Sequence, residues 1–237
     1  MNLVFVDETQ KPGDNSVLAV CALLVNSTKY DGLVTDFGKA LSGVGWSPDE
    51  EFKGSYIFSQ SKGDRAVSVE KRIKLADSVL SLCQSESNCR VAASVCYNRL
   101  GKSTKNYLRL LDGAIKNLAF CKDKKLGKHL AAIYIDFRSD VTQPQLSDVL
   151  MPLLTSKGCT LLEDCCVLHS RPRHVGLALV DIIGYITIAN HLKEPHDSDM
   201  FGGLFATTAE AKKRQLLQGW FDKVKKVRIK ELKASAM

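Results

Sequence analysis

The chain has 237 residues, of which 45% are hydrophobic and 25% charged, as in soluble globular proteins with a substantial core. Its net charge of +7 is concentrated near the C-terminus, where residues 210–233 hold nine basic and three acidic side chains, a local charge of +6. A basic surface of this kind favours a polyanionic partner, with nucleic acid first. A solvated helix face without a partner explains the same charges equally well. The longest early apolar run, residues 17–25, is too short for a membrane-spanning helix.

The eight cysteines are best explained as reduced thiols. Their spacing contains no CxxC pair, and residues such as Cys21 and Cys96 lie in apolar runs, where free cysteine behaves as a small hydrophobic residue. Cys165, Cys166 and His169 lack the second pair of ligands that a zinc site requires. Met1 leads straight into a strand pattern, so we expect no signal peptide and a cytoplasmic location.

The pattern of apolar residues predicts an α/β domain. A strand over residues 3–8, a turn at 11–15 and a strand over 17–25 form an antiparallel hairpin. The remaining apolar patterns predict helices near 29–41, 66–85, 103–120, 144–154, 175–189 and 209–232, and strands near 90–97, 131–136 and 159–168. A hairpin followed by alternating strands and helices indicates a mixed five-stranded sheet with helices on both faces. We expect one main domain over residues 1–206, with a basic helical segment, 207–237, packed on it or appended to it.

Three aspartates interrupt strongly apolar elements. Asp7 follows four apolar strand residues, Asp136 follows the run of residues 131–135, and Asp181 lies inside the apolar helical stretch. Burying an unpaired carboxylate costs several kcal/mol or more, so we expect Asp7 to end its strand at water, a cation or a metal. Together these three acids predict carboxylates that converge on one divalent-cation site.

Carboxylates from separate elements are the ligands that hold Mg²⁺ or Mn²⁺ for phosphodiester hydrolysis. Glu51 is a fourth candidate ligand, and Lys53, two residues further on, shares a face with it in an extended segment and would offset the charge of the scissile phosphate. Glu8 points to the opposite side of the strand from Asp7 and is a weaker candidate.

Each acid also has an ordinary structural explanation. Asp7 caps the following turn, Asp136 starts a turn, Glu51 is a solvated acid beside Lys53, or Asp181 forms a buried pair with an arginine. A haloacid-dehalogenase phosphatase is less compatible with the sequence, because such enzymes need a second aspartate at the position where this chain has threonine. The chain also has no Walker-type phosphate loop.

Four short motifs, in their order along the chain, resemble the domain-of-unknown-function 3800 family. These motifs are Val6-Asp7-Glu8-Thr9, Glu51-Phe52-Lys53-Gly54-Ser55, Ile133-Tyr134-Ile135-Asp136, and Ser170 followed by Leu177-Ala178-Leu179-Val180-Asp181. The resemblance implies an RNase H-like fold, an association with mobile elements and phage defence, three aspartates as metal ligands, and the Glu-x-Lys pair as auxiliaries. The chain departs from the family pattern at Thr9, His169, Ala178 and Val180, which affects the expected substrate contacts more than metal binding.

The sequence therefore predicts a divalent-metal-dependent nuclease acting on DNA or RNA. The alternative is a non-catalytic nucleic-acid-binding or partner-docking protein, and a homo-oligomer or a protein partner is compatible with either. The basic side chains expected to contact the nucleic-acid backbone are Lys122, Lys124, Lys125, Lys212, Lys213, Arg214, Lys225 and Lys226.

Overall fold

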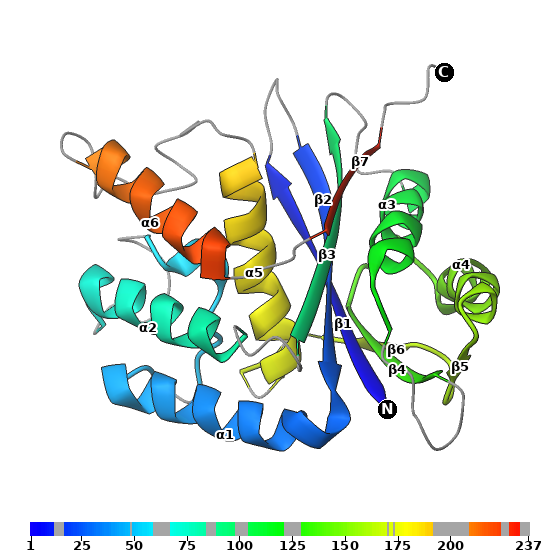
Figure 1. Cartoon of the computed structure of the whole chain (residues 1–237), viewed down its shortest axis with the longest axis horizontal. Helices are drawn as coiled ribbons and strands as arrows, with labels where there is room; N and C mark the ends of the chain where they lie inside the picture. Colours follow the sequence, from blue (N-terminus) through cyan, green and yellow to red (C-terminus); the bar gives the residue numbers. More distant parts are fainter. Residues whose placement is uncertain are drawn as a thin grey trace.

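The computed structural model has one central sheet with helices packed on both of its faces (Figure 1). It describes residues 1–11, 17–47, 49–58, 67–83, 89–97, 104–120, 129–169, 171–172, 174–191, 209–223 and 228–232. The helices are α1 (Ser27–Val44), α2 (Val69–Leu82), α3 (Thr104–Asn117), α4 (Gln143–Ser156), α5 (Val175–His191) and α6 (Ala209–Lys223), with a 3₁₀ turn η1 (Gly54–Tyr56). Helices α1, α2, α5 and α6 lie on one side of the sheet, and α3 and α4 lie on the other.

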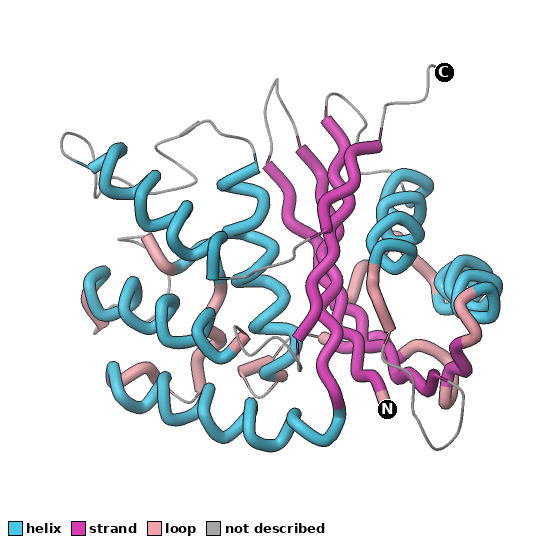
Figure 2. Tube along the Cα trace, in the orientation of Figure 1, coloured by secondary structure: helices cyan, strands magenta, loops and turns pink. Residues whose placement is uncertain are grey.

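The sheet is built around the N-terminal hairpin. Its strands are β1 (Asn2–Lys11), β2 (Val17–Asn26), β3 (Cys89–Tyr97), β4 (His129–Asp136), β5 (Cys159–Leu161), β6 (Cys166–Leu168) and β7 (Arg228–Leu232). Their order is β5-β4-β1-β2-β3-β7, and β6 also pairs with β4. The strands lie together in one sheet between the helices (Figure 2). Strands β1, β2 and β3 are antiparallel neighbours, whereas β4 runs parallel to β1, and β7 runs parallel to β3.

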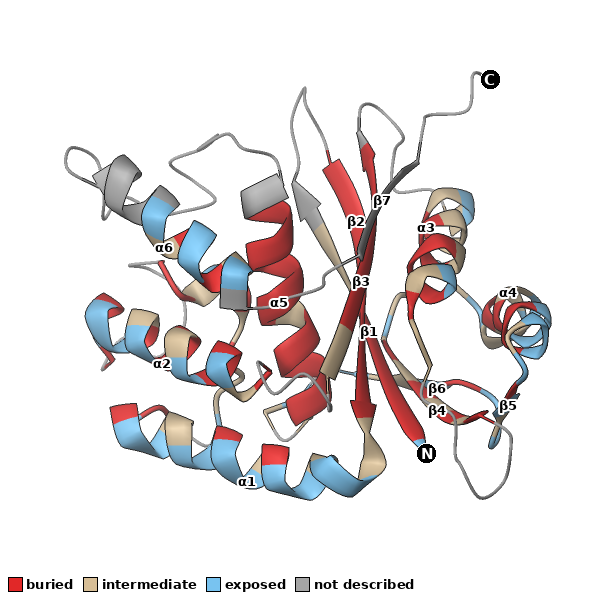
Figure 3. Cartoon of the chain, viewed as in Figure 1, coloured by how far each residue is buried: buried red, intermediate tan, exposed pale blue. Residues whose placement is uncertain are grey.

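Burial explains why the central strands are so apolar. Strand β2 is buried from its first residue to its ninth, because helices cover both faces of the sheet (Figure 3). Two large apolar clusters result, one beneath α1, α2 and α5 and the other beneath α3 and α4. The predicted mixed α/β architecture, with its antiparallel hairpin and helices on both faces, is confirmed.

Local signals define several helix ends. Helix α1 begins after Asn26, whose side chain accepts a hydrogen bond from the Thr28 amide, and ends at Gly45, which adopts a left-handed conformation with φ of 75°. A capping box formed by Thr142 and Gln145 begins α4. None of the described helices combines the length and the apolar character that crossing a membrane requires.

Two predicted elements differ in the structure. The strand expected over residues 159–168 is divided into β5 and β6, because both short segments pair with β4 at different points along its length. The helix expected over 209–232 ends at Lys223, and residues 228–232 instead form β7 at the edge of the sheet. The sheet therefore has seven strands instead of the predicted five.

Helix α6 packs against the helical layer. The side chains of Leu217 and Trp220 are buried, and the Trp220 indole N–H donates a hydrogen bond of 3.1 Å to Oδ1 of Asp77 on α2. The α6 segment is therefore part of the same helical layer as α2 and α5.

Helix α5 approaches the sheet closely at Gly176. A Cβ atom there would lie 2.3–2.4 Å from the Phe5 ring, and this ring is stacked against Tyr30 and Tyr134 at centroid distances of 5.4 and 5.3 Å. Because two rings stack against it, the Phe5 ring has little freedom to move away. Glycine at this position is what lets α5 pack directly on β1.

Gly176→Ala is expected to lower the free energy of unfolding by about 1–3 kcal/mol, because the added methyl group overpacks the contact with Phe5. Gly38→Ala, in α1, is the matched control, since a Cβ atom there meets nothing within 4 Å. That control should stabilise the protein by about 0.5–1 kcal/mol through helix propensity. Urea unfolding of both variants measures the difference, and equal effects would contradict the proposed tight contact.

Candidate active site

The register of β1 and β4 places two of the predicted acids side by side. The two strands are paired as far as Val6 and Ile135, and the next residues are Asp7 and Asp136. Side chains at matching positions of parallel strands share a face, and the residues two positions earlier on each strand pack in the cluster beneath α5. Both aspartates therefore face α5.

The expectation that Asp7 ends its strand is wrong. Strand β1 continues to Lys11 and stays paired with β2 along its whole length. What ends beside Asp7 is the neighbouring strand β4, at Asp136. The acid is therefore placed in the middle of a strand, at the point where its parallel neighbour stops.

Asp181 reaches the same point from the middle of α5. The Asp7 and Asp181 carboxyl groups are close enough to raise or lower each other's pKa directly. Oδ2 of Asp181 accepts a hydrogen bond of 2.5 Å from the Gly54 amide. Acids from β1, β4 and α5 are thus brought together, as predicted.

Burial and mutual repulsion dominate the electrostatics of this acid cluster, formed by Asp7, Asp136 and Asp181. Burial is the largest cause that raises the pKa of Asp7 well above its usual range, and the charges of Asp181 and Asp136 add to it. Burial also raises the pKa of Asp181 from 3.8 to about 6, against the opposing effects of the Gly54 amide and the Lys53 ammonium. Without a cation, burial and repulsion therefore both disfavour ionisation of the cluster.

The predicted Glu-x-Lys pair lies beside Asp181. The Lys53 ammonium is 3.2 Å from Oε2 of Glu51, and both side chains influence the Asp181 carboxyl, Lys53 by lowering its pKa and Glu51 by raising it. The Lys53 side chain is 38% exposed, so its charge remains accessible to a ligand. The structure therefore brings Glu51 and Lys53 to the edge of the acid cluster.

Gly54 is a site residue that the sequence interpretation quoted only as part of a motif. A Cβ atom at Gly54 would lie 2.6 Å from Cβ of Tyr185 and 3.2 Å from the backbone oxygen of Asp181. Glycine is needed so that the backbone amide can reach the buried carboxylate. Its position directly after the Glu-x-Lys pair was the available sequence signal.

The sequence interpretation also missed a charged network on the opposite face of β1. Nη1 of Arg138 donates a hydrogen bond of 2.7 Å to Oε1 of Glu8, and Nε and Nη2 bind both oxygens of Asp140 at 3.0 and 2.9 Å. The guanidinium lies 4.5 Å from the centre of the Tyr107 ring. Glu8 follows Asp7, and Arg138 lies two residues after Asp136. This ion pair therefore joins the two acid-bearing segments just beyond the point where their backbone pairing stops.

The acid cluster suits a divalent cation in ligand type and charge. It offers only hard oxygen donors, and a cation would relieve the repulsion that raises the pKa of Asp7. In the described part of the chain, however, no three Asp, Glu, His or Cys side chains stand in an arrangement that could already hold a metal. Oδ2 of Asp181 accepts a hydrogen bond from the Gly54 amide, and Oδ1 of Asp7 accepts one from the Glu8 amide.

The predicted nucleic-acid-binding residues are not tested by the structure. Lys122, Lys124, Lys125, Lys225 and Lys226 lie outside the described residues. Residues 212–214 belong to the backbone of α6, but their side chains are not among those described.

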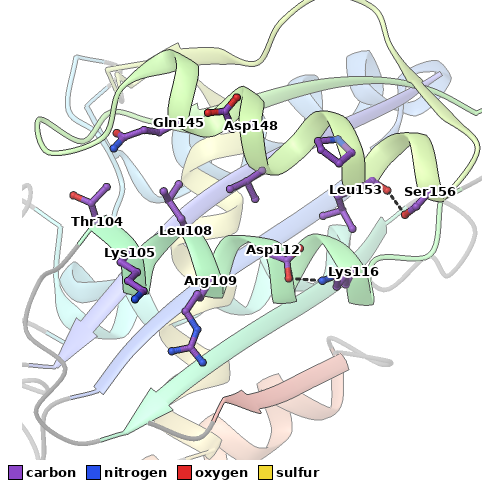
Figure 4. Close-up of a pocket in the computed structure, with 12 residues that line it drawn as sticks. Thr104, Lys105, Leu108, Arg109, Asp112, Lys116, Gln145, Asp148, Leu153 and Ser156 are labelled. Atoms are coloured by element: carbon purple, nitrogen blue, oxygen red, sulfur yellow. Dashed lines mark hydrogen bonds and ion pairs between the residues drawn. The ribbon is translucent and has the colours of Figure 1, made fainter. Parts of the chain in front are cut away.

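A groove of about 960 Å³ lies between α3 and α4 (Figure 4). Its lining includes the ion pair between Lys116 and Asp112 on α3, at 2.6 Å, together with Asp148 on α4. These two helices cover the face of the sheet opposite α5. The groove therefore contains none of the predicted site residues.

The strand order and the helices on both faces of the sheet define a mixed α/β protein. Among solved structures, the chain is similar to ribonuclease H2 from Pyrococcus horikoshii OT3, with 13% identity, 90% of this chain and 84% of that chain covered, and a TM-score of 0.45. It is also similar to RNase HII of Archaeoglobus fulgidus in its complex with PCNA, with 16% identity, coverage of 96% and 94%, and a TM-score of 0.41. No family model and no curated protein matches the chain.

The raised pKa of Asp181 predicts a stability difference that depends on pH. The folded protein favours the protonated form of Asp181. This preference stabilises the folded state fully below pH 3.8, and the stabilisation is lost as the pH rises through about 6. In chelator, Asp181→Asn should therefore gain stability relative to wild type between pH 5 and 8, by roughly 1–3 kcal/mol. Urea unfolding at both pH values measures this gain. Asp36→Asn, at an exposed ion pair on α1, should show no such trend. If the difference in unfolding free energy between Asp181→Asn and wild type is the same at pH 5 and pH 8, the raised pKa of Asp181 is contradicted.

The ion pair between Glu8 and Arg138 should contribute measurably to stability. The Arg138 side chain is only 11% exposed, so Arg138→Gln leaves the carboxylate of Glu8 partly buried and unpaired, at a cost of about 1–3 kcal/mol. A double-mutant cycle with Glu8→Gln should give a coupling energy of about 1 kcal/mol or more. The same cycle at the exposed pair of Asp36 and Lys39 should give less than about 0.5 kcal/mol. Similar coupling energies in the two cycles would be evidence against a stabilising role of the partly buried ion pair between Glu8 and Arg138.

Proposed function

We propose that the protein is a divalent-metal-dependent nuclease that hydrolyses phosphodiester bonds in DNA or RNA. The observation that supports this most is the meeting of carboxyl groups from β1, β4 and α5 at one partly buried point. In this proposal Asp7, Asp136 and Asp181 bind Mg²⁺ or Mn²⁺, and Glu51 is a fourth ligand. Such a cation supplies Lewis acidity toward the phosphate and lowers the pKa of bound water.

The roles of the chain's own residues follow from their positions. Asp7 and Asp181 would hold the cation through their carboxyl oxygens, which lie close enough to influence each other's pKa. The hydrogen bond from the Gly54 amide fixes the orientation of the Asp181 carboxyl group. Lys53, partly exposed and close to Asp181, offsets the negative charge of the phosphate that enters the site.

The biological setting is proposed on the four sequence motifs alone. They support membership of the domain-of-unknown-function 3800 family, and with it a role in a mobile element or in phage defence. A cytoplasmic location and a homo-oligomer or protein partner belong to the same proposal.

A second candidate is a non-catalytic module that binds nucleic acid or a partner protein. The specific observation in its favour is that the acids are already bonded within the chain. Asp181 accepts a hydrogen bond from the Gly54 amide, and Glu51 forms an ion pair with Lys53. Among the described residues, no group of three such side chains is arranged to hold a metal. In this alternative the fold is retained without turnover.

Incubation of the purified protein with labelled single-stranded, duplex and hybrid oligonucleotides, with Mg²⁺, Mn²⁺ or chelator, distinguishes the two candidates. The nuclease proposal predicts cleavage that requires metal and falls more than about 100-fold in Asp136→Asn, because even outer-shell partners of a metal typically cost 10–100-fold when removed. Asp36→Asn removes an exposed carboxylate on α1 and should leave cleavage unchanged. Salt-sensitive binding without cleavage favours the second candidate.

Melting temperatures separate metal binding from turnover in the same variants. A ligand present at 100 times its dissociation constant stabilises the folded state by about 2.7 kcal/mol, so Mn²⁺ should raise the melting temperature of wild type. Asp7→Asn and Asp181→Asn should abolish this increase, and Asp36→Asn should retain it. No response of the wild type to millimolar metal would remove the basis of the nuclease proposal.

A further inference from the structure

An exposed aromatic side chain directly follows the acid at the end of β4. Phe137 is 46% exposed, and in the described part of the chain it is the only aromatic residue among the exposed large hydrophobic side chains. Its backbone amide donates a hydrogen bond of 3.0 Å to Oδ1 of Asp136. The backbone of Phe137 is therefore bonded to one of the three acids of the cluster.

The neighbouring strand holds this ring in place. The Phe137 amide also donates a hydrogen bond of 2.8 Å to the Leu168 carbonyl, which continues the pairing of β4 with β6 by one residue. As a result the Phe137 ring lies against the exposed His169 ring, with a centroid distance of 4.1 Å and an interplanar angle of 36°. One side of the phenyl ring is thus supported, while much of its surface remains open to solvent.

The chemistry around this pair points to a ligand with both a flat ring and a negative charge. Arg171, two residues beyond His169, is exposed and adds a positive charge. A nucleotide places its base one sugar away from its phosphate, so a strand with one phosphate at the acid cluster can carry a base past the end of β4, where Phe137 lies. Bases inside a duplex are stacked on each other, and only an unpaired base offers its face to a side chain.

We propose that Phe137, supported by His169, is a stacking platform for an unpaired nucleobase next to the acid cluster. The substrate class is therefore single-stranded or locally unpaired nucleic acid rather than an intact duplex. This inference rests on the proposed nuclease function and adds to it the form of nucleic acid that the site accepts.

The test measures binding by fluorescence anisotropy in chelator, where metal-dependent cleavage does not occur. Phe137→Ala should weaken the binding of a labelled single-stranded oligonucleotide about tenfold, in line with the loss of one base-stacking contact, and should change duplex binding little. Phe137→Tyr preserves the aromatic face and should restore single-strand binding. Leu162→Ala is the matched control, because Leu162 is 49% exposed and has no ring.

The outcomes separate this inference from the proposed function. If wild type binds or cleaves nucleic acid and Phe137→Ala behaves like wild type, the stacking platform is refuted and the nuclease proposal stands. Equal losses in Phe137→Ala and Leu162→Ala, or no rescue by Phe137→Tyr, also refute the platform. If wild type neither binds nor cleaves any of the oligonucleotides, the proposed function itself fails.

Discussion

The structure depends most on the cost of placing several carboxyl groups in one partly buried position. A fold gains nothing in stability from such a cluster, because burial and repulsion both oppose ionisation. The cluster persists here because β1, β4 and α5 are fixed by large apolar contacts on both sides of the acids. The apolar packing of the sheet thus supports a local arrangement that is unfavourable without a cation. This separation between a stable scaffold and a strained polar site is common where proteins bind ions or perform catalysis.

Two polar contacts restrict the positions of the acids. On the α5 side, the amide of Gly54 holds one oxygen of Asp181, at a position where any side chain would collide with Tyr185. On the opposite face, Arg138 connects to Glu8 and thereby restrains the segments that follow Asp7 and Asp136. The first contact is a hydrogen bond from the backbone and the second is a partly buried ion pair. Together they restrain the acid cluster from both faces of the sheet.

The sequence predicted the parts of this arrangement that leave a local signal. A carboxylate within an apolar run is unusual, and this alone identified Asp7, Asp136 and Asp181. The contact of Gly54 could not be predicted from chemistry, because a backbone amide looks the same at every position. The pair of Glu8 and Arg138 joins residues 130 positions apart, a separation over which no periodicity operates. Strand β7 was interpreted as helix because it is short and basic, while the partner that makes it a strand, β3, lies far earlier in the chain.

The strand order also has a consequence for the way the chain folds as it is synthesised. The antiparallel trio β1, β2 and β3 emerges first, with both of its outer edges open. The edge along β1 is covered only when β4 appears, and the edge along β3 waits for β7, the last strand described. An apolar three-stranded intermediate with two open edges is a template for unwanted strand addition. Nascent chains of this protein should therefore be most prone to aggregation, and most dependent on chaperones, before β4 has left the ribosome.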